Sequence, residues 1–348
     1  MKRARQFGTL IGLVGLCFVL WILTPYFLTV SNLLNVAEQT SINAIVAVGM
    51  TYVILSGGID LSVGSIVALT GVILGVALRD GQPLAIALTL TLAVGVVCGA
   101  VNGVLVSHGG LPPFIVTLGT MSIARGAALL VTEGRPISGF AASFRVLATG
   151  RVGFVPAPVI ITAAVYVLAH LVLTRTTFGR YVYAIGGNEE ATRLSGVAVR
   201  FHKAMIYVVS GVMSAVAAVI LTARLNSAQP IAGMMYELDA IAATVIGGTS
   251  LMGGRGGLAG TFVGVLIFGL LSDILQLHNI DSNVQLLMKG LIIVCTVLLQ
   301  EQNLGQLFSR WRIGLPRKEN AGSKTVESCR PPSAAKAQFA RQDLDEAS

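Results

Sequence analysis

The chain has 348 residues, of which 54% are hydrophobic and 11% are charged, and its formal net charge is +8. Soluble globular domains carry roughly 25% charged residues, so this composition excludes an ordinary soluble domain. The positive charge does not indicate a nucleic-acid partner, because the basic residues gather beside apolar segments: at the N-terminus, in the 174–203 loop and in the C-terminal tail. The composition therefore predicts a polytopic integral membrane protein.

The first apolar segment follows Lys2, Arg3 and Arg5, an arrangement that a secretory signal peptide would also show. No small-x-small cleavage site follows Leu23, however, because the next residues are Thr-Pro-Tyr-Phe. We therefore expect this segment to be retained as the first membrane span.

About 20 apolar residues are needed to cross roughly 30 Å of hydrocarbon. An all-α helix bundle of about ten spans is predicted on this basis, at 8–28, 36–55, 61–78, 83–106, 113–131, 156–173, 204–222, 236–250, 258–277 and 284–300. The eighth segment is short, and a re-entrant helix is an alternative there. Ten spans with a cytoplasmic N-terminus place the basic 174–203 loop and the tail inside, but they leave Arg135, Arg145 and Arg151 outside, so eight or nine spans stay possible.

The second and third segments are separated by a break at Ser56-Gly57-Gly58, which is followed by Asp60 and Ser62. A carboxylate at a bilayer centre costs about 2.5–3.5 kcal/mol, so such a group is usually capped, paired or facing water. Two interpretations stay open and are compatible. Asp60 caps the third helix by accepting its first-turn amides, or it lines a path and contacts a hydroxylated solute.

A second Gly-Gly element repeats this spacing, since Gly57-Gly58-x-x-Leu-x-x-Gly recurs as Gly247-Gly248-x-x-Leu-x-x-Gly. Broken helices and repeated helix groups are typical of transporters, although glycine-rich breaks also resemble one another by chance. The ten-span count places both elements on the same side of the membrane. We predict a translocation path or gate formed by Gly57, Gly58, Asp60, Ser62, Asn102, Gly247 and Gly248.

The basic loop contains the pattern of a short capped helix. Asn188 is a good N-cap, Glu189 and Glu190 would occupy the first turn, Arg193 lies near the end, and Gly196 is a stop signal. From the spacing alone, this helix is either an ordinary solvated surface helix or a rigid lever for a partner protein.

Signatures of enzymes and metal sites are missing from the sequence. It contains no GxSxG, no HExxH and no GxxxxGK[ST], and its four cysteines form no CxxC pattern. We expect no catalytic residue, no metal, no disulfide and no cofactor, and no hydrolysis of ATP by this chain alone. From Pro316 onward the apolar pattern ends, so a membrane domain over 1–315 and a disordered cytoplasmic tail over 316–348 are predicted.

Four stretches of the chain occur in the same order as in one known protein family: residues 48–64, residues 102–103 with 111–119, residues 179–196, and residues 243–257. Together they resemble the ribose/xylose/galactose-type permease subunits of bacterial ABC sugar importers, over roughly residues 35–300. Within them, Glu190-Ala-Thr192-x-x-x-Gly196 resembles the family's EAA-x-x-x-G coupling loop, with a threonine replacing the second alanine.

This resemblance implies a permease in the bacterial inner membrane with both termini cytoplasmic, paired with a second copy or a similar permease. It further implies a cytoplasmic ATPase subunit that binds ATP, a periplasmic sugar-binding protein, and transport by alternating access. The coupling residues would be Gly186, Gly187, Asn188, Glu189, Glu190, Ala191 and Gly196.

The main alternative is an ion-coupled secondary transporter of a small polar solute, and a membrane scaffold is a second one. Ion coupling would use buried ionisable groups, for which Glu38, Asp60 and Lys289 are the candidates. The sequence does not identify the sugar.

Overall fold

The computed structural model describes residues 2–24 and 27–300, which form one compact unit. Its helices are α1 (Lys2–Leu23), α2 (Val30–Leu55), α3 (Val63–Arg79), α4 (Leu84–Ser107), α5 (Pro113–Thr132), α6 (Ala142–Thr149), α7 (Ala157–Arg175), α8 (Thr177–Gly187), α9 (Glu189–Leu194), α10 (Val199–Leu225), α11 (Tyr236–Ile246), α12 (Leu258–Leu277) and α13 (Ser282–Gln300). The predicted boundary at 315 and the tail over 316–348 lie outside the described residues.

Two small antiparallel pairs are the strands of the described part of the chain. The pair of β1 (Ile137–Ser138) with β4 (Ser227–Ala228) joins two loops that are far apart in sequence. The strands β2 (Arg151–Val152) and β3 (Val155–Pro156) form a hairpin. Each strand has two residues, so the all-α fold class predicted from the sequence is confirmed.

Each of the ten predicted apolar segments coincides with a helix, and five of them, α4, α5, α7, α10 and α12, are long and apolar enough to cross a membrane. The eighth segment is shorter than predicted, because α11 ends at Ile246 rather than at residue 250. Its 11 residues rise about 17 Å, which is too short to cross the hydrocarbon. The bundle is polytopic and α11 is one of its interrupted helices.

Helix α10 lies at the centre of the bundle and packs against α2, α3 and α4. Gly95, Gly99 and Gly103 form one row on α4 that faces α10. A Cβ atom on Gly95 would come within 2.7 Å of the Ala215 Cβ, so only glycine lets the two backbones approach this closely. This is the small-xxx-small packing typical of membrane helices, where dispersion contacts replace the hydrophobic effect.

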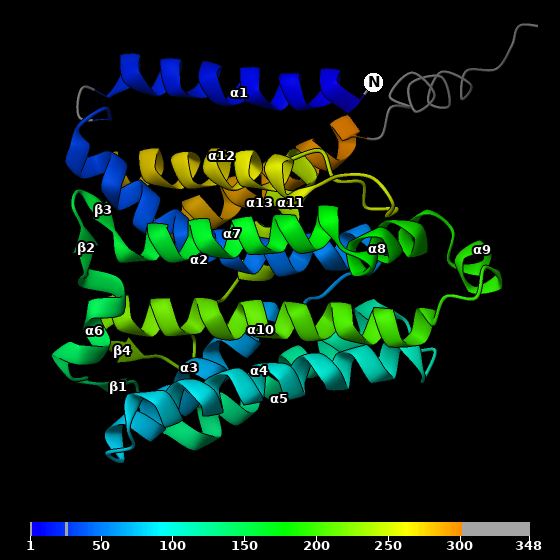
Figure 1. The fold of residues 1–348 in the computed structure, drawn as a ribbon. Coiled ribbons are helices and arrows are strands. Elements are labelled where there is room, and N and C mark those ends of the chain that lie inside the picture. The colour runs from blue at the N-terminus through cyan, green and yellow to red at the C-terminus, as the bar shows by residue number, and fades with distance from the viewer. Residues whose placement is uncertain (1, 25–26, 301–348) are drawn as a thin grey trace, which may run out of the picture. The chain divides into compact units, whose positions relative to one another are not determined.

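Helix α2 is buried along most of its length, and its residues Ile45, Met50 and Ile54 pack into the main core with Ala217 of α10 and Val265 of α12. Helix α1 lies at the outer edge of the unit beside α12, as Figure 1 shows.

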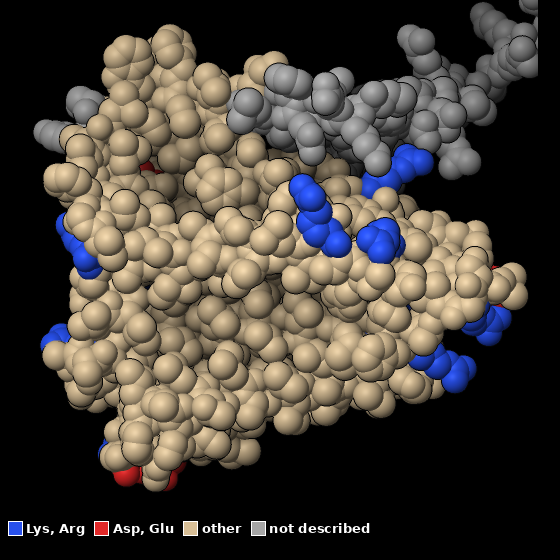
Figure 2. All heavy atoms as spheres, in the orientation of Figure 1, with Lys and Arg blue, Asp and Glu red and all other residues tan. Residues whose placement is uncertain are grey.

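The loops separate into two ends of the unit. Figure 1 shows α6 and the hairpin β2–β3 at one end, and α8, α9 and the N-terminal end of α1 at the other. The loop with Arg135, Arg145 and Arg151 therefore lies opposite α9, which agrees with the ten-segment topology. On the face drawn in Figure 2, Lys and Arg side chains gather mainly toward the α8–α9 end, and the middle of the bundle is almost uncharged.

Candidate functional site

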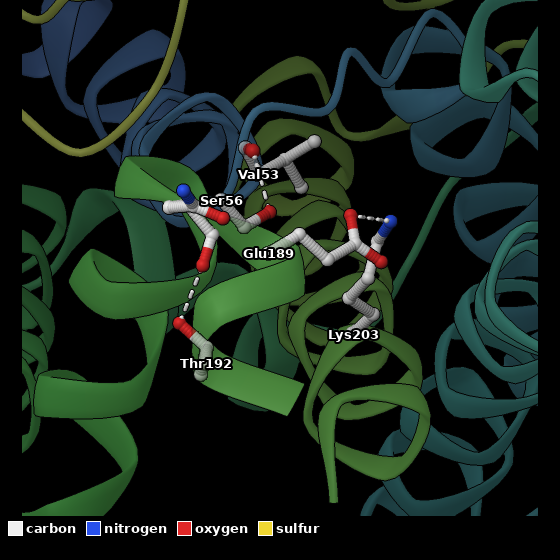
Figure 3. Close-up of polar contacts among 6 residues, drawn as sticks. Val53, Ser56, Glu189, Thr192 and Lys203 are labelled. Atoms are coloured by element: carbon white, nitrogen blue, oxygen red, sulfur yellow. Dashed lines mark hydrogen bonds and ion pairs between the residues drawn. The ribbon is translucent and has the colours of Figure 1, made fainter. Parts of the chain in front are cut away.

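Helix α9 is the short capped helix that the sequence predicts. The Asn188 side chain accepts a hydrogen bond from the Ala191 amide at 2.9 Å, and Gly196 follows the helix with a φ of +83°. Thr192, which replaces the alanine of the coupling pattern, donates to the Asn188 carbonyl oxygen at 2.7 Å (Figure 3). Its hydroxyl is thus accommodated inside the helix.

Two ion pairs involve α9. Arg193 donates to Glu190 at 2.6 Å within the helix. Lys203 of α10 binds Glu189 at 2.9 Å and connects α9 to α10 (Figure 3). The hydrogen bond to Glu190 raises the pKa of the Arg193 guanidinium. At the end of the helix, Leu194 is 78% exposed, an apolar side chain on an otherwise polar helix.

The end of α8 meets both helix breaks at one place, which we call the glycine junction: residues 55–57, 186–187 and 253–254. The Gly254 amide donates to the Leu55 carbonyl oxygen at 2.9 Å. A Cβ atom on Gly186 would collide with that same oxygen and would lie 2.6 Å from the Gly254 nitrogen. Gly57 and Gly254 have φ values of +80° and +69°, which favour glycine.

A side chain adds to this backbone contact. Tyr183 of α8 donates its hydroxyl to the Gly256 carbonyl oxygen at 3.0 Å. The second Gly-Gly element therefore contacts the first break at one end of the described unit, and α8 joins them to α9. That both elements face the same side of the membrane stays a prediction. The sequence predicts the short capped helix α9. It does not reveal the glycine junction, because contacts between backbones leave no sequence pattern other than the glycines.

Asp60 lies at the centre of a buried hydrogen-bond network. Its carboxylate accepts from the Ser62 amide at 3.0 Å, from the Ser62 hydroxyl at 2.6 Å and from the Ser210 hydroxyl of α10 at 2.7 Å. Asn102 of α4 donates to the Ser62 hydroxyl at 2.8 Å and accepts from Thr120 of α5 at 2.6 Å. These hydrogen bonds connect the segment between α2 and α3 to three other helices, α10, α4 and α5.

The predicted capping role of Asp60 is wrong. Helix α3 begins at Val63, so its N-cap residue is Ser62, whose side chain makes no capping bond. The chain from residue 58 to residue 62 is irregular, Ser62 has helical dihedrals (φ −83°, ψ −12°), and the Asp60 carboxylate accepts a hydrogen bond from Ser210 of α10. Asp60, Ser62 and Asn102 are each fully buried within the single chain.

The four glycines of the predicted path have different structural roles at the two helix breaks. Gly57 and Gly248 have positive φ values of +80° and +87°. Gly58 is buried against Tyr207, and Gly247 packs against α12, since a Cβ atom there would lie 2.6 Å from the Thr261 nitrogen. That these residues line a path stays a prediction.

The structure also reveals buried ionisable groups that the sequence reasoning did not single out. Asp239 of α11 binds Lys289 of α13 at 2.9 Å, and Asp273 of α12 accepts from Asn32 of α2 at 2.9 Å. Arg125 donates to the carbonyl oxygens of residues 230 and 232. An ionisable residue inside an apolar segment is a signal that the sequence offers for such groups. The sequence does not reveal their partners, because these lie 50 to 241 residues away.

The described unit is a polytopic helix bundle in which the end of α8 meets two helix breaks and leads into the capped helix α9. The chain belongs to the family described as branched-chain amino acid transport system / permease component, whose model matches residues 32–297.

Curated relatives agree with this assignment. The ribose import permease protein RbsC of Haemophilus influenzae is 47% identical over 292 residues, covering 83% of this chain and 90% of the relative. The D-allose and L-arabinose transport system permease proteins of Escherichia coli are 37% and 38% identical; each alignment covers 84% of this chain, and 91% and 89% of the respective relative. The predicted resemblance to ribose-type ABC sugar permeases is confirmed. No solved structure matches the chain.

Proposed function

We propose that this chain forms the translocation path of an ATP-driven importer for a monosaccharide in the bacterial inner membrane. The relatives are named as permeases for ribose, allose and arabinose. The observation that carries the mechanism is the glycine junction, because it connects the exposed helix α9 to both helix breaks.

The proposed mechanism is alternating access. A separate cytoplasmic ATPase binds ATP and pushes on α9, with Leu194 as the apolar contact at its tip. Displacement of α9 moves the end of α8, and the close backbone packing at Gly186 transmits this movement to the ends of α2 and α11. A periplasmic binding protein delivers the sugar, and a second permease subunit completes the path.

Ion coupling is less well supported, because two of the three ionisable candidates are already engaged within the protein. Lys289 is paired with Asp239, and the Asp60 carboxylate accepts three hydrogen bonds. Sugar uptake into vesicles that hold an ion gradient but no ATPase would contradict the proposal.

The coupling role of α9 is tested with Glu190→Arg and Gly196→Val. The first variant reverses the charge that holds Arg193, and the second places a branched residue at a φ of +83°, so both should abolish uptake. Uptake of labelled D-ribose by cells and the amount of the chain in the membrane are measured together. Asp80→Arg, an exposed acidic residue at the end of α3, is the matched control and should transport normally. Unchanged uptake by Glu190→Arg and Gly196→Val would remove the coupling assignment.

A further inference from the structure

A polar cavity of about 270 Å³ lies between α2, the end of α10, and the helices α11, α12 and α13. Each of these five helices contributes polar side chains to its lining. A larger groove of about 540 Å³, between α2, α7 and α12, has an almost entirely apolar lining and offers little to a polar solute. The smaller cavity is therefore the one suited to hydrogen bonding with a ligand.

Two polar atoms at this cavity have no partner within the described residues: the Thr40 Oγ1 and the Asn43 Oδ1, both of α2. Thr40 is only 5% exposed. Thr51, Thr70 and Thr91 each donate to the carbonyl oxygen four residues earlier, whereas Thr40 makes no such bond. Buried polar groups are normally hydrogen-bonded, so unsatisfied ones on a cavity wall indicate a ligand.

Two basic side chains and one acidic side chain line the cavity. Asp239 and Lys289 bind each other at 2.9 Å, and Arg224 at the end of α10 lies in the same lining. The Asp239–Lys289 pair keeps lone pairs and N–H groups for further hydrogen bonds. The ring of Tyr236 adds an apolar surface with a polar tip. A neutral solute with several hydroxyl groups fits this set, because each hydroxyl both donates and accepts.

The cavity lies toward the end of the unit opposite α9. Arg224 and Leu225 at the end of α10 and Gln276 near the end of α12 line it. Asn43 precedes Leu55 of the glycine junction by twelve residues on α2, which corresponds to about 18 Å along the helix axis. The cavity is therefore separate from the junction and lies beside the interrupted helix α11, and transporters commonly bind their substrates beside interrupted helices.

We infer that this cavity is a binding site for a neutral polyhydroxylated solute, in which the Thr40 hydroxyl and the Asn43 amide contact the solute directly. The inference rests on the proposed function and names a solute site within it. The open hydrogen-bonding capacity of Thr40 and Asn43 and the paired charges in the same lining carry it.

The first test uses Thr40→Val and Asn43→Leu in the complete importer, with labelled D-ribose as the probe. Thr40→Val removes a hydroxyl that has no partner among residues 2–24 and 27–300, so thermal stability should be kept while the uptake rate at saturating D-ribose falls about 3- to 10-fold. Asn43→Leu should lower the rate by a similar factor. The matched control is Thr91→Val on α4, which loses a helical hydrogen bond and should transport at the parental rate.

The second test measures occupancy without the binding protein. Ser272 lines the cavity, so Ser272→Cys reports labelling by a small polar thiol reagent in the permease–ATPase complex, against the parent chain as background. D-ribose should slow this labelling and L-leucine should not, and Ala191→Cys on α9 should be indifferent to both.

The outcomes separate this inference from the proposed function. A parent importer that moves none of D-ribose, D-allose and L-arabinose contradicts the proposed function. A parent that transports D-ribose, with parental rates for Thr40→Val and Asn43→Leu and no protection at Ser272→Cys, overturns the site alone. Protection by L-leucine rather than D-ribose overturns the assigned class of solute.

Discussion

At the scale of single residues, Asp60 shows how a carboxylate can lie inside a membrane helix bundle. Three donors from Ser62 and Ser210 satisfy it, and Asn102 extends the network to α4. An isolated charge in this position would be expensive, but hydrogen bonds to a carboxylate are roughly twice as strong as those between neutral groups. These hydrogen bonds are sufficient to explain why a carboxylate is buried at position 60.

Substitution of Asp60 separates this structural role from a role in the path. Asp60→Ala leaves three buried donors without an acceptor, at about 1–3 kcal/mol for each unsatisfied group, so the thermal midpoint of the purified protein should fall clearly. Asp60→Asn keeps an oxygen for Ser62 and can donate to Ser210, so both stability and uptake should be largely retained.

The informative contrary result would be an Asp60→Asn protein that is stable but inactive in uptake. It would show that the negative charge itself is needed, as the predicted path-lining role requires. Asp80→Asn, at an exposed position, serves as the control for a change of one charge.

At the scale of elements, the glycine junction packs the end of α8 closely against the end of α2 and the 247–257 loop. Gly186 and Gly187 are neighbours, but a Cβ atom on Gly186 would overlap another backbone, whereas a Cβ atom on Gly187 would meet nothing within 4 Å. The pair therefore offers a substitution and its control at adjacent positions.

Gly186→Ala should force α8 away from Leu55 and Gly254, since the added methyl group would overlap the backbone. Overpacking of this kind costs about 1–3 kcal/mol or more, and uptake should fall while ATP hydrolysis by the complex continues. Gly187→Ala should match the parent in both assays. Equal uptake by the two variants would mean that the junction does not transmit movement.

Some properties of these elements could be predicted from the sequence and others could not. Asn188, the two glutamates and Gly196 predict α9 correctly because capping is a local interaction. The capping role given to Asp60 failed because its carboxylate binds Ser210, 150 residues later, and local spacing does not reveal such a partner. Lys289 was a candidate from the sequence, but its partner Asp239, 50 residues earlier, was not predicted for the same reason.

At the scale of the whole molecule, the positions of the two ends predict a membrane orientation. Helix α9 and the hairpin β2–β3 lie at opposite ends of the described unit (Figure 1), and basic residues gather toward α9, as they do on cytoplasmic faces. The site at the junction would then face the cytoplasm.

Membrane orientation is tested with single cysteines at two exposed positions. Ala191→Cys on α9 should react with a membrane-impermeant thiol reagent only from the cytoplasm, and Phe154→Cys, at a position 86% exposed in the β2–β3 turn, only from outside. The parent chain gives the background from the native cysteines. Labelling of both positions from one side would contradict this topology.

The sequence by itself determined the helical membrane class, the positions of the ten apolar segments and the short capped helix α9, because hydropathy and capping depend on residues that are close together in the chain. Only the tertiary structure decided that the two helix breaks meet at Gly186, that Asp60 is satisfied by α10, and that a polar cavity opens beside Thr40 and Asn43. These features depend on contacts between residues that are distant in the chain, and they form only when the helices pack.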